Sequence, residues 1–258
     1  MAKSETGARK TSRAGRNLPA AIAVGAFLGF SLIAILLFAP YVWLPVVAVA
    51  VALATHEVIR RLRTAGYAIP VWPLLIGGQA APGSDVAGPA APGNYLRDIS
   101  ATVFLAAWVP LFASFGALLI YPDDGAGRVF CLMLGVVFSD IGGYTAGVLF
   151  GKHPMAPAIS PKKSWEGLAG SLLLGITASV LAVNFLLHKP AWVGVPLGLM
   201  LVITGTLGDL VESQVKRDLG IKDMGTLLPG HGGLMDRLDS LLPNAFMAWL
   251  LLSVFLGT

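Results

Sequence analysis

The stretch LPAAIAVGAFLGFSLIAILLFAPYVWLPVVAVAVALAT, residues 18–55, contains no charged side chain. An α-helix needs only about 20 apolar residues to cross the hydrocarbon core of a bilayer, so this stretch is long enough for two crossings. Pro40 lies near its middle, where a proline can end one helix and begin the next. Residues 18–55 therefore predict a hairpin of two membrane-spanning helices, from 18 to 39 and from 40 to 55.

The composition of the whole chain agrees with a membrane protein. Of its 258 residues, 55% are hydrophobic, about 67% when the 31 glycines are added, and 12% are charged, whereas ordinary soluble domains have about 45–50% apolar residues, glycine included, and about 25% charged ones. The mean hydropathy is +0.75. So little charge cannot cover a soluble domain of this size, which argues against a soluble enzyme, a disordered protein and a nucleic-acid binder. The single cysteine, Cys131, excludes an intrachain disulfide, and we expect it to be a small packing residue.

Five further apolar runs predict an all-α, polytopic membrane protein with about seven transmembrane helices, within a range of seven to nine. These runs cover residues 99–121, 126–150, 166–187, 191–211 and 241–257. The segment 66–98 does not fit: its apolar part is too short to span, and a linker rich in Ala, Pro and Gly follows. Its path stays open between a re-entrant, an interfacial and a truncated segment. The predicted parts are a basic tail at 1–17, a hairpin with a basic loop at 18–65, the irregular segment at 66–98, and a transmembrane domain at 99–258 with loops at 151–165 and 212–240.

The distribution of positive charge predicts the orientation. If the seven runs alternate across the membrane, 16 of the 18 lysines and arginines lie on the side of the N-terminus. Only Arg128 and Lys189 lie on the other side. Since basic loops are retained in the cytoplasm, the tail and both loops are predicted to be cytoplasmic. The basic pI of about 9.3 is then a sign of topology, and no nucleic-acid partner is expected.

Acidic residues at membrane depth are functional candidates, because a bilayer disfavours every charge placed in it. Asp140 lies in GVVFSDIGGYTAGVLFG, residues 135–151, and Asp209 and Glu212 lie in ITGTLGDLVESQVKRD, residues 203–218. An interhelical hydrogen bond is the alternative role for Asp140. The glycines spaced four apart in the same run, Gly143, Gly147 and Gly151, predict a close helix-packing seam.

The most informative stretch for function is SQVKRDLGIKDMGTLLPGHGGLMDRLDS, residues 213–240, in which acidic and basic residues alternate with glycines. Asp236 and Asp239 are three residues apart at the start of the last helix, so both carboxylates project from one face. Asp209 and Ser213 share a face at the end of the preceding helix. If those helix ends meet, Asp209, Asp236 and Asp239 form an all-oxygen set suited to Mg²⁺. The alternative is a mixed-charge loop that is merely solvated.

Cations and glycines accompany these carboxylates, a combination that phosphoryl or nucleotidyl transfer requires. In PMAPAISPKKSWEG, residues 154–167, Lys162 and Lys163 are predicted to bind further phosphates, unless they only mark the cytoplasmic side. Pro161 and Ser164 predict a turn and a helix N-cap, with Glu166 in the first turn.

Residues 213–239 resemble, without a gap, the signature of the phosphatidate cytidylyltransferases, also called CDP-diacylglycerol synthases. The resemblance extends to GDLVES at 208–213, SPKKSWEG at 160–167 and SDIGGY at 139–144, and covers roughly 97–243. The N-terminal third is similar only in being hydrophobic. Family members usually carry more membrane sequence where this chain has GGQAAPGSDVAGPAAPGN, residues 77–94.

The resemblance implies that 99–258 is a catalytic domain that transfers cytidylyl from CTP to phosphatidic acid, giving CDP-diacylglycerol and pyrophosphate for phospholipid biosynthesis. It implies Mg²⁺, a second, monovalent cation such as K⁺, and an active site on the cytoplasmic face of the plasma membrane. Membrane lipids and a second copy in a homodimer are the expected partners. The alternatives are a CTP-dependent enzyme acting on another lipid phosphate or a lipid alcohol, and an ion-coupled transporter.

The resemblance also implies roles for individual residues. The expected metal ligands are Asp209, Asp236 and Asp239. The expected phosphate-binding cations are Lys216, Arg217, Lys222 and Arg237. His231 is expected to contact a phosphate or the leaving group, with a structural role as the alternative, and Glu212 to orient the cations together with Asp223. The remaining substrate-pocket residues are Ser160, Lys162, Lys163, Glu166, Ser213, Gly232, Gly233 and Asp140.

Overall fold

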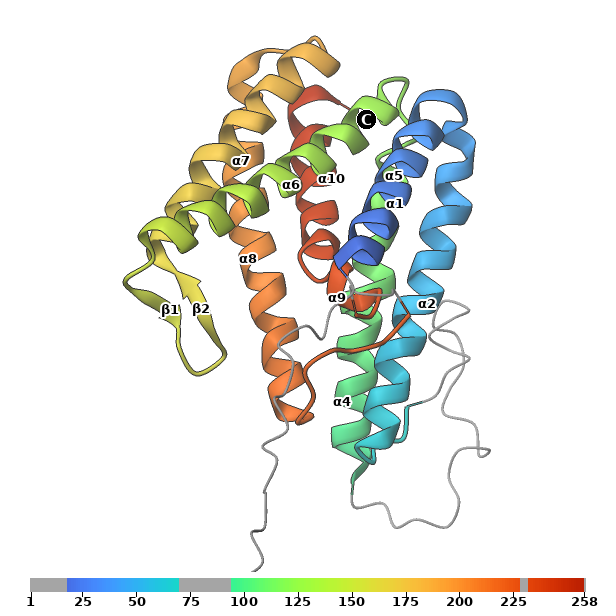
Figure 1. Cartoon of the computed structure of the whole chain (residues 1–258). Helices are drawn as coiled ribbons and strands as arrows, with labels where there is room; N and C mark the ends of the chain where they lie inside the picture. The colour runs from blue at the N-terminus through green and yellow to red at the C-terminus, as the bar shows by residue number, and fades with distance from the viewer. Residues whose placement is uncertain (1–17, 70–93, 228–231, 258) are drawn as a thin grey trace, which may run out of the picture.

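The computed structural model describes residues 18–69, 94–227 and 232–257, with side chains of the first helix described from Gly25 onward. The chain forms a bundle of helices from which one small β-hairpin extends (Figure 1). In chain order the elements are α1 (Leu18–Phe38), η1 (Pro40–Val42), α2 (Trp43–Thr64), α4 (Tyr95–Ala106), η3 (Ala107–Leu111), α5 (Phe112–Leu118), α6 (Gly125–Phe150), β1 (Pro154–Ala156), β2 (Ser160–Ser164), α7 (Trp165–Leu186), η4 (Ala191–Val193), α8 (Gly194–Asp218), α9 (Met235–Leu238) and α10 (Leu241–Leu256).

Six helices of described residues are long and apolar enough to cross a membrane, which confirms the polytopic, helical fold. They run over Pro40–Thr64, Tyr95–Leu118, Gly125–Phe150, Trp165–Leu186, Ala191–Asp218 and Met235–Leu256. The remaining predicted run corresponds to α1, whose part from Gly25 to Phe38 is a shorter apolar helix. The antiparallel pair of β1 and β2 is the single sheet of the described ranges.

Several helices extend further than their apolar runs. Helix α8 continues to Asp218 instead of ending at 211, so the predicted loop 212–240 begins as a helix. Helix α2 continues to Thr64, and α4 begins at Tyr95, inside the predicted irregular segment. Hydropathy marks only the membrane-facing part of a helix, whereas Lys, Arg and Glu continue the backbone hydrogen bonds equally well. The tail 1–17 and residues 70–93 lie outside the described residues.

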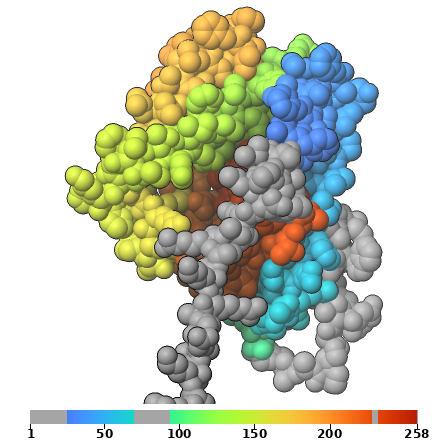
Figure 2. Space-filling model, viewed as in Figure 1, coloured from blue at the N-terminus to red at the C-terminus, as the bar shows by residue number. Residues whose placement is uncertain are grey.

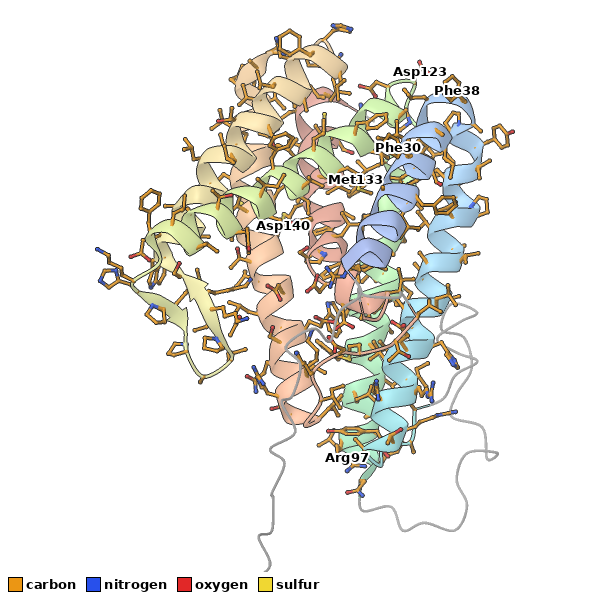
Figure 3. The ribbon with its side chains drawn as sticks, viewed as in Figure 1. Phe30, Phe38, Arg97, Asp123, Met133 and Asp140 are labelled. Carbon is orange, nitrogen blue, oxygen red and sulfur yellow. The ribbon has the colours of Figure 1, made fainter. Side chains whose placement is uncertain are left out.

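The connections alternate between two ends of the bundle. Phe38 and Asp123 lie at one end and Arg97 lies at the other (Figure 3). The two cations predicted to lie apart from the rest, Arg128 and Lys189, line one cavity together with the C-terminal end of α10. Nη2 of Arg128 donates to the carbonyl oxygen of Gly257 at 2.9 Å. The two cations therefore share an end, as the alternating topology requires.

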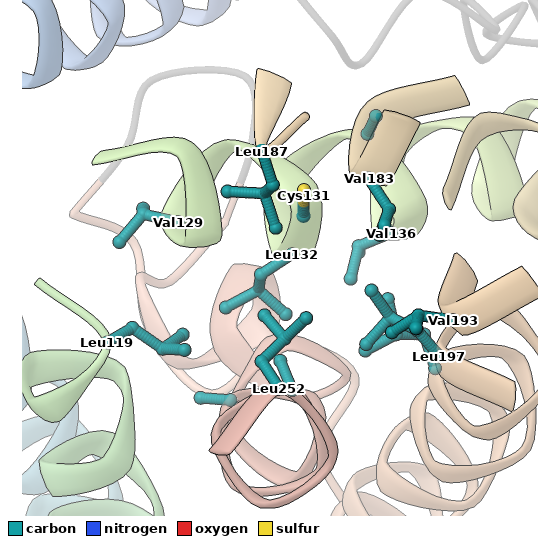
Figure 4. Packing of buried hydrophobic residues seen from close by; sticks show 14 of the residues in the cluster. Leu119, Val129, Cys131, Leu132, Val136, Val183, Leu187, Val193, Leu197 and Leu252 are labelled. Carbon is teal, nitrogen blue, oxygen red and sulfur yellow. The ribbon is translucent and has the colours of Figure 1, made fainter. Parts of the chain in front are cut away.

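Small residues bring α6 and α7 into close contact. A Cβ atom at Gly143 would clash with Oγ of Ser171, and the place of a Cβ at Gly147 lies 3.8 Å from Cα of Gly167. The predicted packing seam is confirmed. Cys131 is fully buried in the adjoining core, as predicted, among side chains of α6, α7, α8 and α10 (Figure 4).

Glycines also bring α8 against the start of α10. A Cβ at Gly208 would clash with the carbonyl oxygen of Asp239, and one at Gly205 would lie 2.7 Å from Nδ2 of Asn244. Small residues at such a crossing allow backbones to approach more closely than larger side chains permit. This approach places Asp209, the next residue of α8, beside Asp239.

Candidate active site

A cavity of about 490 Å³ lies between α6, β2, α7, α8, α9 and α10. In Figure 2 the surface is hollowed between α6 with the hairpin on one side and the rest of the bundle on the other, and α8 lies in the depth of the hollow. The charged residues that line the cavity all belong to the predicted site: Asp140, Lys162, Lys163, Asp209, Asp236, Arg237 and Asp239. Asp140 faces this cavity from the middle of α6, where α6 passes over α8 (Figure 3).

Three carboxylates form an acidic cluster, of which Asp209 and Asp239 line the cavity. One oxygen each of Asp209, Glu212 and Asp239 lies within 4.8 Å of the other two. Nζ of Lys163 lies 2.5 Å from Oδ2 of Asp209, and the hydroxyl of Ser213 donates to Oδ1 of the same residue at 3.4 Å. Two of the three predicted metal ligands therefore meet here. The third member is Glu212, which the sequence suggested as an orienting residue.

The side chain of Glu212 is fully buried. Its Oε2 lies 2.5 Å from Nζ of Lys216, one turn further along α8. Within the described part of the chain, its Oε1 is buried and has no hydrogen-bond partner. A buried carboxylate oxygen without a hydrogen bond is costly, so the cluster has the capacity to bind a further cation.

Asp236 lies beside this cluster, and its oxygens already accept hydrogen bonds. Oδ1 accepts from Nζ of Lys216 at 3.0 Å, and Oδ2 accepts from the backbone N–H of Gly233 at 2.8 Å. The N–H of Met224 donates to both oxygens, at 3.1 and 3.0 Å. Lys216 therefore bridges Asp236 and Glu212, and Asp236 connects the segment before α9 to the cluster.

The β-hairpin brings Ser160, Lys162 and Lys163 to the cavity. Ser164 caps α7 as predicted, because its Oγ accepts the N–H of Gly167 at 3.1 Å. Pro161 lies within strand β2 and not in the turn that the sequence suggested.

Glu166 fixes the base of the hairpin and does not line the cavity. Its Oε2 accepts the backbone N–H groups of Lys152 and His153 at 3.2 and 3.3 Å. Its Oε1 lies 2.6 Å from Nδ1 of His153. Glu166, predicted to belong to the substrate pocket, thus lies beside the site and holds the hairpin that carries Lys162 and Lys163.

The other predicted residues that the structure describes do not line the cavity. Nε of Arg217 donates to the carbonyl oxygen of Ile159 at 3.3 Å, which connects α8 to the hairpin. Lys222 is exposed, and the carbonyl oxygen of Asp223 accepts from Arg61. Gly232 has a φ of +88°, a left-handed conformation that favours glycine. His231 lies outside the described residues.

Sequence reasoning missed several contributors. Thr206 and Asn244 line the cavity, and Asn244 accepts a hydrogen bond from Thr204. Glu57 and Arg61 of α2 contact Met235 and Met224, respectively. The signal for Asn244 was a polar residue inside the last apolar run. Glu57 was taken for a loop residue because its predicted helix ended at 55.

The arrangement suits the binding of phosphates together with a hard cation. Asp209, Glu212, Asp236 and Asp239 carry four formal negative charges, and Lys163 and Lys216, which form ion pairs with them, carry two positive ones. Carboxylate oxygens are the ligands of Mg²⁺ in proteins, and lysines beside such an ion neutralise phosphate oxygens.

Comparisons with known proteins point in the same direction. Residues 68–255 match the model of the Cytidylyltransferase family. The chain is 58% identical to the phosphatidate cytidylyltransferase of Mycobacterium bovis, over 96% of this chain and 92% of the relative. It is 59% identical to that of Mycobacterium leprae, over 95% and 91%. It is 42% identical to that of Staphylococcus epidermidis, over 46% of each chain. The alignment with the Mycobacterium bovis protein has 281 positions, more than the 258 residues of this chain.

Proposed function

The chain belongs to the phosphatidate cytidylyltransferase family, and from this premise we propose that the cavity between α6, α7, α8 and α10 is where it makes CDP-diacylglycerol from CTP and phosphatidate. The observation that carries the assignment is the acidic cluster of Asp209, Glu212 and Asp239, flanked by Lys163 and Lys216. Membership of this family decides against the ion-coupled transporter that the polytopic helices also suggested.

The donor set fits Mg²⁺, since all its atoms are carboxylate oxygens and Oε1 of Glu212 is buried without a hydrogen bond from any described residue. Asp209, Glu212 and Asp239 would hold the ion. When bound, it supplies positive charge that polarises phosphate oxygens. Asp236, expected from the sequence as a ligand, is assigned instead to holding Lys216. A second, monovalent cation stays a prediction.

The reaction needs two phosphates in contact and no covalent enzyme intermediate. A phosphate oxygen of phosphatidate attacks the α-phosphorus of CTP, a new P–O bond forms, and the bond to the β-phosphate oxygen breaks, so pyrophosphate leaves. Lys162, Lys163 and Arg237 line the cavity and are placed to neutralise phosphate oxygens. Holding the two reactants in line in a fixed site accounts for much of the acceleration of such a step.

We place the active site on the cytoplasmic face of the plasma membrane. Arg128 and Lys189 lie together at one end of the bundle, and the basic segments near the site belong to the predicted cytoplasmic side. A site at this surface lets the diacyl tails of phosphatidate stay in the bilayer while CTP arrives from water. A homodimer also stays a prediction.

The test follows labelled CTP with the purified full-length chain. With Mg²⁺ and phosphatidate, label in the α-phosphate should enter the lipid fraction, and label in the γ-phosphate should appear in released pyrophosphate. A chelator should stop both. Asp209→Asn should lower the rate at least about 10³-fold, because a charged oxygen of the cluster is lost.

Asp218→Asn is the matched control, since Asp218 is exposed at the end of the same helix and bonded to Gln214. It should keep the wild-type rate. Wild-type turnover by Asp209→Asn would contradict the placement of the site. Transfer of the γ-phosphate would indicate a lipid kinase, and a stronger response to another lipid phosphate or to a lipid alcohol would identify a different acceptor.

A further inference from the structure

Two side chains of α2, one helical turn apart, contact Met224 and Met235, the first residue of α9. Oε2 of Glu57 accepts the backbone N–H of Met235 at 3.0 Å. Nε of Arg61 donates to the carbonyl oxygen of Met224 at 2.8 Å. Glu57 and Arg61 thus contact the two described ends, 224–227 and 232–235, of the stretch 224–235. Both side chains lie outside residues 68–255, which match the family.

Gly225 and Gly233, one at each described end of the stretch 224–235, leave room for the Glu57 carboxylate. A Cβ at Gly225 would clash with Oε1 of Glu57, and a Cβ at Gly233 would lie 2.7 Å from Oε2. No larger residue fits at either position unless this carboxylate moves. The glycines allow a close approach of backbone to a side chain, and that side chain comes from another helix.

The contacts continue from α2 to the acidic cluster. Met224, whose carbonyl oxygen binds Arg61, also donates its N–H to Asp236. Asp236 accepts from Lys216, and Lys216 binds Glu212. A displacement of the stretch 224–235 would therefore move the groups that hold Glu212 in place.

We propose that Glu57 and Arg61 are positioning residues that hold residues 224–225 and 233–235 and, through Asp236 and Lys216, set the geometry of the acidic cluster. Neither residue lines the cavity, so they act through the backbone and do not touch substrate. The proposal rests on the function proposed above. It adds to the site a helix that its sequence motifs do not include.

The experiment compares Glu57→Ala, Glu57→Gln and Arg61→Gln with Arg60→Gln, which changes an exposed arginine on the same turn. The measurements are kcat, the half-saturating Mg²⁺ concentration, and hydrogen exchange of the stretch 224–235 without substrate. Glu57→Ala should lower kcat about 10²-fold, raise the Mg²⁺ requirement and speed exchange. Glu57→Gln keeps an acceptor oxygen for Met235 and should recover most of the protection. Arg60→Gln should match the wild type.

A second arm tests the contact itself. Gly225→Ala should impair the wild-type protein strongly, because the new methyl group meets the Glu57 carboxylate. In the Glu57→Ala background that clash is absent, so the same change should have little further effect. Equal effects of Gly225→Ala in both backgrounds, or unchanged exchange and kcat in Glu57→Ala, would overturn the positioning role. If no protein, wild type included, forms CDP-diacylglycerol, the proposed function fails, whereas the exchange data still decide whether Glu57 and Arg61 hold residues 224–225 and 233–235.

Discussion

Replacing Lys216 by methionine should destabilise the protein by about 3–5 kcal/mol, because it leaves the buried carboxylate of Glu212 without its cation. Lys216 is 17% exposed and Glu212 is 0% exposed, so water cannot replace the lost partner. The ammonium group also bonds Asp236 at 3.0 Å, and that contact is lost too. By the scaling of soluble domains of this size, the midpoint of thermal unfolding should fall by roughly 6–20 °C.

The assay is thermal unfolding of the detergent-solubilised protein, with CDP-diacylglycerol formation measured in parallel. The double variant Lys216→Met/Glu212→Gln carries no unpaired carboxylate at this position, so it should recover about 1–3 kcal/mol relative to Lys216→Met. It should stay inactive, since both residues belong to the proposed site. Lys222→Met removes the same charge from an exposed position and should change stability by no more than about 0.5 kcal/mol. An unchanged midpoint for Lys216→Met would refute the reasoning.

Two further predictions concern the approach of α8 to α10 and the lysine of the hairpin. Gly208→Ala should lower activity at least about tenfold, because a methyl group there clashes with the carbonyl oxygen of Asp239. Gly29→Ala, which has open space around it, should be neutral. A normal rate for Gly208→Ala would show that α8 and α10 can separate without loss of activity. Lys163→Gln should lower the rate of cytidylyl transfer about 10²-fold, because it removes the cation 2.5 Å from Asp209. Lys152→Gln changes an exposed lysine beside the same hairpin and should leave the rate unchanged. Equal rates for the two variants would exclude a role for Lys163.

The positions of the helices and the charged residues that line the cavity were predictable from the sequence. Apolar runs longer than a bilayer is thick can form only helices there, since every backbone group must be bonded within the segment. The Ser164 cap is likewise local, because it depends on residues three positions apart. The glycines of the seam are spaced four apart within one segment, although Gly143 meets Ser171 of another helix. Helix ends were predicted less well, as at Thr64 and Asp218, because a helix continues past its apolar part.

Which carboxylates meet could not be read from the chain. The spacing of Asp236 and Asp239 shows that they share a face, yet Asp236 turns to the N–H groups of Met224 and Gly233. Glu212, expected to orient the cations, belongs instead to the cluster with Asp209 and Asp239.

The sequence by itself determined a polytopic membrane protein, its alternating topology and a set of acidic and basic residues suited to phosphate chemistry. Periodicity, length and charge are properties of single segments, and they are sufficient for these conclusions. Only the tertiary structure decided that Asp209 lies beside Asp239, through the approach of two backbones at Gly208, and that Glu57 of a distant helix accepts the backbone N–H of Met235. These contacts depend on how whole helices cross, which small residues permit but which no single segment specifies.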